Sequence, residues 1–553
     1  MRLFKTSNLR NYISLDGLWD FCIDPCNKGE SEEWFKNFPQ DAEQMYVPLC
    51  WNTESKYFKY EGKAWYRTYF DSRCDTYNLY FDSVQKACKV YVDGKELAYH
   101  YGGFTGFTVT GKGVGRHCLV VMADNTHNDI NTIPLAHVDW FHYGGISGSV
   151  SLVCYKDAYI DKHRISYILE GKSAKVNVKF NICGNYSSKV KVTFDEKTVA
   201  EFDGKSGENV CEFSVGNIEL WDTENPVLYN VGIVIDNDDI IDRIGFRTIE
   251  ARDKKIYLNN REIKLKGINR HNDCPDFGFS MPFVLMKRDI EIIRDLGCNV
   301  IRGSHYPNPE ILLDYFDSTG MLFWEEIPMW GFKKDSLADP VTLERGLMMH
   351  SEMIERDYHH PSIILWGLHN EIETTCIEGY NLSKKFADHI RSLDDSRLVT
   401  FATARPAGDL CLALADVISV NMYPGWYGGH NCKDECDEIM KQLYANMEKL
   451  DVMDKPLMIT EFGAGAVMGQ STFTYAKWTE QYQASLIADL VDKYYNDYDV
   501  NGTFVWQYCD MYSAFEKELE RPRSFNNKGI VDEYRRPKLG YYALKNAYEK
   551  IKD

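Results

Sequence analysis

The sequence lacks long hydrophobic runs and an excess of positive charge, and both absences limit what the protein can be. No run of about 18 apolar residues occurs, so we expect no transmembrane helix. The N-terminal segment MRLFKTSNLRNYISLDG has no apolar core of the kind found in signal peptides, which favours a cytoplasmic location. The formal net charge of -19 disfavours a nucleic-acid partner, because phosphate binding needs a basic surface. An anionic ligand would therefore need a local cationic patch.

The cysteines lack the spacing of a disulfide or metal framework. All 16 are scattered along the chain, so we expect them to be reduced and mostly buried. His430, Cys432 and Cys436 lie close together in the sequence, but no second pair of candidate ligands accompanies them. We therefore expect no metal site.

The length of 553 residues predicts two to four domains. Short alternating runs and turn signals indicate a β jelly roll over residues 1–157, with a type I′ hairpin turn at Asp93–Gly94. Cleaner period-two alternation over residues 158–250 indicates an immunoglobulin-like β-sandwich. Aromatic residues make up 14% of the chain, which suits either an aromatic-lined sugar cleft or ordinary β-rich cores.

After residue 250 the pattern changes to apolar strands that alternate with amphipathic helices. Such a pattern is typical of a parallel sheet covered by helices, and eight units over residues 251–553 predict a (β/α)₈ TIM barrel. The connection between the fifth and sixth strands is short for a helix. The expected strands are 264–269, 299–304, 322–328, 363–370, 398–404, 417–423, 457–463 and 502–508.

Polar side chains gather where these strands end, which is where barrels of this type carry their active sites. Glu371 follows the fourth strand and Glu461 lies near the end of the seventh, so the two carboxylates can face each other across the barrel. Two carboxylates that flank a glycosidic bond can hydrolyse it. A salt-bridged structural role is the usual one for a single glutamate, but two such strand ends favour catalysis.

The motifs around these glutamates, WGLHNEIE and ITEFGAGA, resemble those of glycoside hydrolase family 2. Further matches occur in order along nearly the whole chain, in LDGLWDF, GGFTGFT, GGISGSVSL, LWDTENPVLYNV, IGFRTIE, GINRHND and SHYP. The resemblance implies a jelly roll, an immunoglobulin-like domain and a barrel, and a retaining mechanism that needs no cofactor. It also implies that Glu371 is the acid/base and Glu461 the nucleophile.

The mechanism sets conditions on the neighbourhood of the two glutamates. Glu371 should hold a proton near neutral pH, whereas Glu461 should be hydrogen-bonded and ionised. The resemblance implies that Asn370 binds the sugar 2-hydroxyl and that Tyr423 donates a hydrogen bond to Glu461. His305 and Arg270 are expected to order this region, with a structural role nearly as well supported for Arg270.

The choice of sugar depends on a cationic segment, RPRSFNNKGIVDEYRRPK, over residues 521–538. Its Asn526 and Lys528 match the Asn-x-Lys motif that binds the sugar carboxylate in β-glucuronidases of this family. A buried cation suits a carboxylate and gains little from a neutral hydroxymethyl group. The bland alternative is a solvated basic loop. By the same resemblance, substrate-binding roles are implied for Asp139, Asn421, Tyr427 and Trp506.

The sequence also departs from the β-glucuronidase pattern. Gly148 stands where many relatives carry arginine, and Pro522 stands where an arginine is usual, flanked by Arg521 and Arg523. These changes leave recognition of the sugar 4-hydroxyl open. We expect a β-glucuronidase that acts on small-molecule or oligosaccharide glucuronides and forms a homo-oligomer. The alternatives are a β-galacturonidase, a β-galactosidase and, less favoured, an inactive glycan-binding protein.

Overall fold

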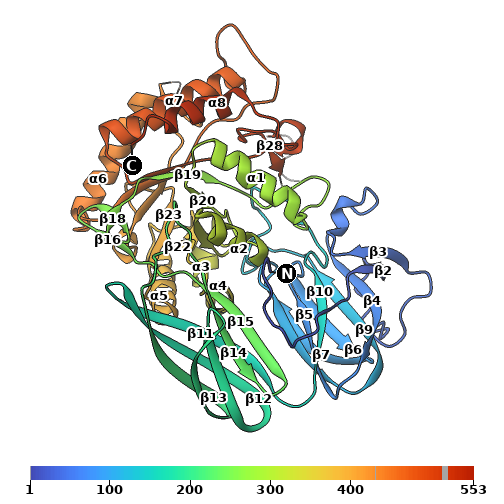
Figure 1. Cartoon of the computed structure of the whole chain (residues 1–553). Helices are drawn as coiled ribbons and strands as arrows, with labels where there is room; N and C mark the ends of the chain where they lie inside the picture. Colours follow the sequence, from blue (N-terminus) through green and yellow to red (C-terminus); the bar gives the residue numbers. More distant parts are fainter. Residues whose placement is uncertain (1, 430, 514–520, 553) are drawn as a thin grey trace.

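The computed structural model describes residues 2–429, 431–513 and 521–552. Two β units lie side by side at one end of an α/β barrel, with the N-terminal unit in blue and the second in teal (Figure 1). The multidomain architecture expected from the sequence is confirmed, including the order of its parts.

The N-terminal unit is built from two antiparallel sheets around an aromatic core that includes Trp19, Trp51 and Tyr66. Asp93 and Gly94 have φ of 51° and 76° and join two strands directly, which confirms the predicted hairpin. The first sheet has the order β3-β2-β4-β9-β6-β7 and the second β1-β10-β5-β8. The strands are β1 (Ile13–Ser14), β2 (Gly17–Asp24), β3 (Glu43–Val47), β4 (Lys63–Ser72), β5 (Thr76–Phe81), β6 (Ala87–Val92), β7 (Lys95–Tyr101), β8 (Phe107–Lys112), β9 (Gly115–Asp124) and β10 (Val150–Tyr155).

The second unit is a β-sandwich whose strands alternate inward and outward residues. Val176, Val178 and Phe180 are buried at every second position of one strand, as the sequence pattern predicts. That strand, β12, is long enough to pair with three neighbours. The strands are β11 (Tyr159–Glu170), β12 (Ser173–Phe194), β13 (Lys197–Gly216), β14 (Tyr229–Ile235) and β15 (Asp238–Ile244), followed by a small sheet of β16 (Ile249–Arg252), β17 (Lys255–Leu258) and β18 (Arg261–Glu262).

The C-terminal unit is a closed parallel barrel in which all eight predicted strands pair in chain order. Its strands are buried on both faces, which explains their near-continuous apolar sequences. They are β19 (Leu265–Asn269), β20 (Val300–Arg302), β21 (Leu322–Glu326), β22 (Ile363–Asn370), β23 (Leu398–Thr403), β24 (Ile418–Asn421), β25 (Leu457–Phe462) and β26 (Gly502–Val505).

Amphipathic helices surround this barrel and bury one face each. They are α1 (Phe283–Asp295), α2 (Glu310–Thr319), α3 (Lys334–Ala338), α4 (Pro340–Asp357), α5 (Ile377–Leu393), α6 (Cys432–Lys449), α7 (Glu480–Asp497) and α8 (Leu539–Tyr548). A two-stranded ribbon, β27 (Met511–Tyr512) and β28 (Phe525–Asn526), follows the last barrel strand. Between β23 and β24 a single 3₁₀ turn at Leu412–Leu414 replaces a helix, in keeping with the shortness of that connection.

None of the helices in the described part of the chain has the length and apolar character needed to cross a membrane.

Candidate active site

The fold places Glu371 and Glu461 at the same end of the barrel. Glu371 directly follows β22 and has a left-handed φ of 53°, which turns the chain away from the strand. Glu461 lies on β25 and is 3% exposed. Asn421, at the end of β24, pairs in register with Glu461 and donates a hydrogen bond to Glu371 Oε1 at 2.8 Å, so one residue links the two glutamates.

The carboxylate of Glu461 is held by two strong donors. Arg302 Nη1 donates to Glu461 Oε1 at 2.9 Å, and the Tyr423 hydroxyl donates to Oε2 at 2.7 Å. His305 Nε2 lies 3.8 Å from Oε1. The contact of Tyr423 with Glu461 is the one that the sequence motif predicts.

Arg302 is a central residue of the site that sequence analysis missed. Its guanidinium also donates to Glu326 Oε1 at 2.9 Å and to Asn370 Oδ1 at 2.7 Å. A fully buried arginine in an apolar strand must have acidic partners, so NVIRGS carried a signal for it. Arg270 instead forms a salt bridge with Asp289 on α1 at 2.9 Å, which joins β19 to that helix. Arg302, and not Arg270, is therefore the arginine that orients Glu461.

The surroundings of both carboxyls raise their affinity for a proton. Burial raises the pKa of Glu371, and burial together with the charge of Glu371 raises the pKa of Glu461 to about 8. The pair therefore retains a proton near neutral pH. Since Glu461 accepts bonds from a guanidinium and a phenol whereas Glu371 accepts one from an amide, these donors favour placing that proton on Glu371.

The side-chain amide of Asn370 has an unused hydrogen-bond donor. Its Oδ1 accepts from Arg302 and from Asn421, which fixes the orientation of the amide. Its buried Nδ2 has no hydrogen-bond partner among the described residues. A buried donor held in this way can bind a sugar hydroxyl, as expected for the 2-hydroxyl.

Trp506 and His305 form an aromatic wall beside Glu461. Their rings stack at a centroid distance of 5.1 Å, and Trp506 is 4% exposed. His305 Nδ1 lies 2.6 Å from Glu326 Oε1, but burial lowers the pKa of His305 to about 4. We therefore treat His305 as neutral, with its proton on Nδ1 shared with Glu326.

Lys528 is buried next to this wall. Lys528 is only 1% exposed, and its ammonium donates to the Tyr427 hydroxyl at 2.9 Å. The ammonium also lies 5.6 Å from the ring centre of Tyr423, the residue that donates to Glu461. Tyr423 thus contacts both the Lys528 ammonium and Glu461, the proposed nucleophile. Because Lys528 is buried, it does not belong to a solvated basic loop.

Asp139 reaches this region from the N-terminal unit. Its carboxylate accepts from Arg521 Nη2 at 2.6 Å and from Asn526 Nδ2 at 3.0 Å. The Asn526 amide therefore orients Asp139 here, and Arg521 is a second cation of this region, paired with Asp139. Arg521 Nε is buried and has no hydrogen-bond partner among the described residues, so it can donate to an oxygen of a ligand.

The other cations of segment 521–538 have structural partners. Arg523 pairs with Glu533 at 2.8 Å and Lys538 with Asp510 at 2.7 Å. Arg535 pairs with Asp289 at 2.9 Å, whereas Arg536 is mostly exposed. The segment is therefore a set of individually paired charges, of which Arg521 and Lys528 lie closest to the proposed sugar site.

Two clusters elsewhere have side chains of metal-ligand type. One contains His163, Asp242 and His359, and the other contains Asp314, Asp317 and His360. In the first, His359 Nε2 already accepts from the backbone N–H of Ile165 at 2.9 Å, so Nδ1 carries the proton donated to Asp242. That arrangement fits a hydrogen-bonded joint better than a metal site. His430 lies outside the described residues, so the expectation for His430, Cys432 and Cys436 stays a prediction.

Comparisons with known proteins identify the family of this chain. Residues 249–553 match the TIM barrel domain of glycosyl hydrolases family 2, and residues 158–247 match a second domain of that family. The chain is 27% identical to a β-glucuronidase of Paenibacillus borealis, over 98% of both chains. It is also 27% identical to human β-glucuronidase, over 99% of this chain and 92% of the human one.

Solved structures show the same likeness. A β-galacturonidase of Eisenbergiella tayi, bound to galacturonate, superposes with a TM-score of 0.91 at 33% identity, covering 100% of this chain and 99% of that one. A β-glucuronidase of Ruminococcus gnavus superposes with a TM-score of 0.89 at 27% identity, covering 99% of each.

Proposed function

Because the chain belongs to glycosyl hydrolases family 2 and is a glycoside hydrolase, we propose that it is a retaining β-uronidase that removes terminal β-D-glucuronides or their 4-epimers. One observation carries this proposal: the buried Lys528 ammonium lies 5.6 Å from the ring of Tyr423, which donates to Glu461. A sugar whose anomeric carbon meets Glu461 would bring a C6 carboxylate towards that cation.

In the first step, an oxygen of Glu461 attacks the anomeric carbon while Glu371 gives its proton to the glycosidic oxygen. The bond to the leaving alcohol breaks, and its electron pair takes up that proton. Arg302 and Tyr423 hold Glu461 in position, and Asn421 holds Glu371. The product of this step is an ester between the sugar and Glu461.

In the second step, Glu371 acts as a base. It takes a proton from water as the water oxygen attacks the anomeric carbon, and Glu461 leaves as a carboxylate. Two inversions retain the β configuration. The mechanism requires the carboxyls to lie about 5–5.5 Å apart, which we expect of this pair.

The carboxylate receptor consists of Lys528, Tyr427 and Arg521. Lys528 donates to the Tyr427 hydroxyl, and a substrate carboxylate can take that place as a stronger acceptor. Asp139, oriented by Arg521 and Asn526, is placed to accept from a hydroxyl at C4. Asn370 donates to the 2-hydroxyl through Nδ2.

We keep two sugars as candidates because different observations favour each. The Asn-x-Lys motif and the curated relatives favour a glucuronide. The higher identity to the galacturonidase structure, 33% against 27%, favours a galacturonide. The two epimers differ in the 4-hydroxyl, which is the group that Asp139 would bind.

A panel of p-nitrophenyl β-glycosides tests the proposal, with glucuronide, galacturonide and galactoside assayed side by side. We expect at least one uronide to be hydrolysed with a kcat/KM at least about a hundredfold above that of the galactoside, a difference of ~2.7 kcal/mol. The better uronide identifies the epimer. Rapid galactoside hydrolysis without uronide turnover would contradict the receptor, and proton NMR of the first-formed anomer tests retention.

A further inference from the structure

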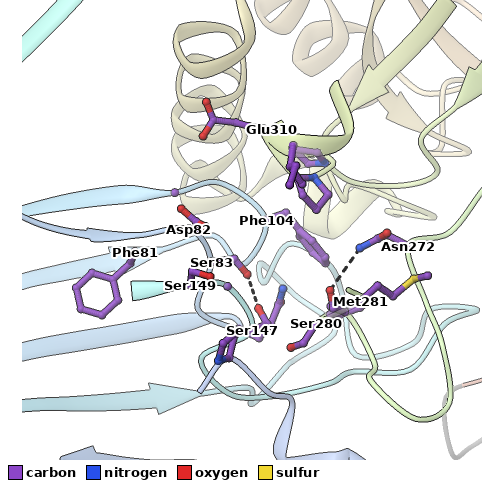
Figure 2. Close-up of a pocket in the computed structure, with 18 of the residues that line it drawn as sticks. Phe81, Asp82, Ser83, Phe104, Ser147, Ser149, Asn272, Ser280, Met281 and Glu310 are labelled. Atoms are coloured by element: carbon purple, nitrogen blue, oxygen red, sulfur yellow. Dashed lines mark hydrogen bonds between the residues drawn. The ribbon is translucent and has the colours of Figure 1, made fainter. Parts of the chain in front are cut away.

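A cavity of about 600 Å³ lies between the N-terminal unit and the loops that follow β19 and β20 (Figure 2). Neither Glu371 nor Glu461 is among the described residues that line it. Its volume falls within the range of ~300–1,000 Å³ in which proteins bind drug-sized molecules. The cavity is therefore distinct from the proposed sugar site and large enough for an organic ligand.

One wall of this cavity is aromatic and the other carries serine hydroxyl groups. Phe104 and Phe279 supply aromatic surface, and Phe104 is stacked on Tyr306 with ring centres 4.1 Å apart. Ser83, Ser147 and Ser149 place hydroxyl groups on the side of β5 and β10, where the hydroxyls of Ser83 and Ser147 hydrogen-bond each other (Figure 2). A ligand that fits both walls has a flat apolar body and a hydroxyl at one side.

The charges around the cavity disfavour an anion. The lining includes the carboxyl groups of Asp16, Asp82 and Glu310. Its guanidinium, on Arg356, is engaged with Asp357 at 2.7 Å and with the carbonyl oxygens of Phe104 and Asn308. A uronic acid would meet these carboxyls without a partner for its own charge, so the ligand is not the sugar.

We propose that this cavity binds a planar aromatic alcohol of two or three rings. The ring system would pack against Phe104 and Phe279, and its hydroxyl would bond a serine of the strand wall. The half-exposed Tyr46 and the exposed Thr108 on β8 mark the edge by which such a molecule enters. This inference concerns binding and does not depend on which glycoside the enzyme hydrolyses.

The cavity is connected to the sugar site through one side chain. Tyr306 lines the cavity, and its hydroxyl lies 3.2 Å from His271 Nδ1. His271 in turn meets Trp506 edge-on at 5.5 Å, and His305, next to Tyr306 in the chain, stacks on Trp506. Occupancy of the cavity would therefore press on the aromatic wall beside Glu461.

Crystals soaked with 6-bromo-2-naphthol test the location, because bromine gives an anomalous signal. We expect the peak between Phe104 and the serine wall. A peak confined to the cleft at Glu371 and Glu461, or no peak, would overturn the proposal. This readout uses the unaltered protein, so a folding defect cannot confuse it.

Solution binding of 2-naphthol, followed by calorimetry, tests the affinity. We expect a dissociation constant on the order of 0.1 mM, in keeping with a ligand of this size. Thr108→Trp fills the edge of the cavity and should weaken binding at least about tenfold. Thr110→Trp is the matched control, since Thr110 is exposed on the same face of β8 but does not line the cavity.

Three outcomes of the solution experiment count against the proposal. The first is equal loss of binding in both variants, and the second is unchanged binding in Thr108→Trp with its melting temperature preserved. The third is a crystal peak without binding in solution, which would mean binding at crystal concentration only. The glycoside panel tests a different property, so failure of one proposal is distinguishable from failure of the other.

Discussion

At the scale of single residues, the surroundings of Glu461 both stabilise its carboxylate and raise its pKa. Arg302 and Tyr423 stabilise its carboxylate, yet burial and the nearby Glu371 raise its pKa to about 8. A nucleophile must be ionised when it attacks, and an acid must hold a proton. One proton shared between two carboxyls meets both needs when it resides on Glu371.

Removing Glu461 should therefore abolish turnover. We expect Glu461→Ala to lower kcat at least about a thousandfold, ~4 kcal/mol of barrier, because the variant lacks the carboxylate that we propose attacks the anomeric carbon. Steady-state assays on the better uronide measure this. The control is Glu448→Ala, at an exposed position on α6, which should keep wild-type activity. Activity of Glu461→Ala within about tenfold of wild type would refute the assignment.

The same carboxyl should make the stability of the protein depend on pH. Because burial and the neighbouring Glu371 raise the pKa of Glu461 from 4.5 to about 8, the pair of carboxyls keeps a proton in the folded protein that the unfolded chain releases between those values. The contribution of Glu461 to stability therefore falls as pH rises through this window.

Glu461→Gln removes that titration. We expect its melting temperature, relative to wild type, to increase from about pH 5 to about pH 8. Differential scanning calorimetry at both pH values measures the difference, and Glu448→Gln, at an exposed position on α6, is the control. A Glu461→Gln difference that is the same at both pH values would show that this carboxyl titrates normally.

At the scale of elements, the ribbon of β27 and β28 leads into the loop that presents Lys528. The segment holds six cations, but their environments differ: Lys528 is 1% exposed whereas the Arg536 side chain is 63% exposed. Because of this contrast, a substitution of Lys528 tests substrate specificity, whereas a substitution of Arg536 tests the general effect of removing a positive charge.

Lys528→Met should lower kcat/KM for the uronide far more than for the galactoside. A loss of at least about a hundredfold on the uronide, ~2.7 kcal/mol, with less than about fivefold on the galactoside is the expected pattern, because only the uronide has a carboxylate to lose. Arg536→Met should change both by less than about twofold. Equal losses on the two substrates in Lys528→Met would assign the lysine a structural role.

The same scale shows what the sequence could and could not predict. The eight barrel strands and the positions of Glu371 and Glu461 follow from local apolar patterns, which is why they were found. Arg302 was missed because its importance comes from partners on three other strands, Asn269, Glu326 and Glu461. The pairing of Arg521 with Asp139 was missed as well, because it joins residues from opposite ends of the chain.

At the scale of the whole molecule, the units are joined by buried polar contacts. We propose that the chain divides near residues 157 and 250. Asp242, on β15, accepts from His163 of the same unit at 2.8 Å and from His359 of the barrel at 2.7 Å. Arg2, from the start of the chain, lies 3.5 Å from its other oxygen.

Asp242→Asn should destabilise this joint by about 2 kcal/mol, because the amide cannot accept from both histidines and leaves a buried N–H donor without a partner. These donors hold the pKa of Asp242 well below its ordinary 3.8, so the stabilisation is present above that pH and is lost in stronger acid. Calorimetry at neutral pH should show a lower melting temperature. Asp236→Asn, at an exposed site, should leave it unchanged.

The reach of Asp139 into the barrel has a wider consequence. The carboxylate that we propose binds the sugar 4-hydroxyl belongs to the N-terminal unit, whereas both proposed catalytic glutamates belong to the barrel. On this proposal, recognition of the 4-hydroxyl lies in a different part of the polypeptide from bond cleavage. A barrel grafted onto a foreign N-terminal unit would keep its hydrolytic machinery and its carboxylate receptor but lose its discrimination between 4-epimers, so these capacities are free to diverge separately in evolution.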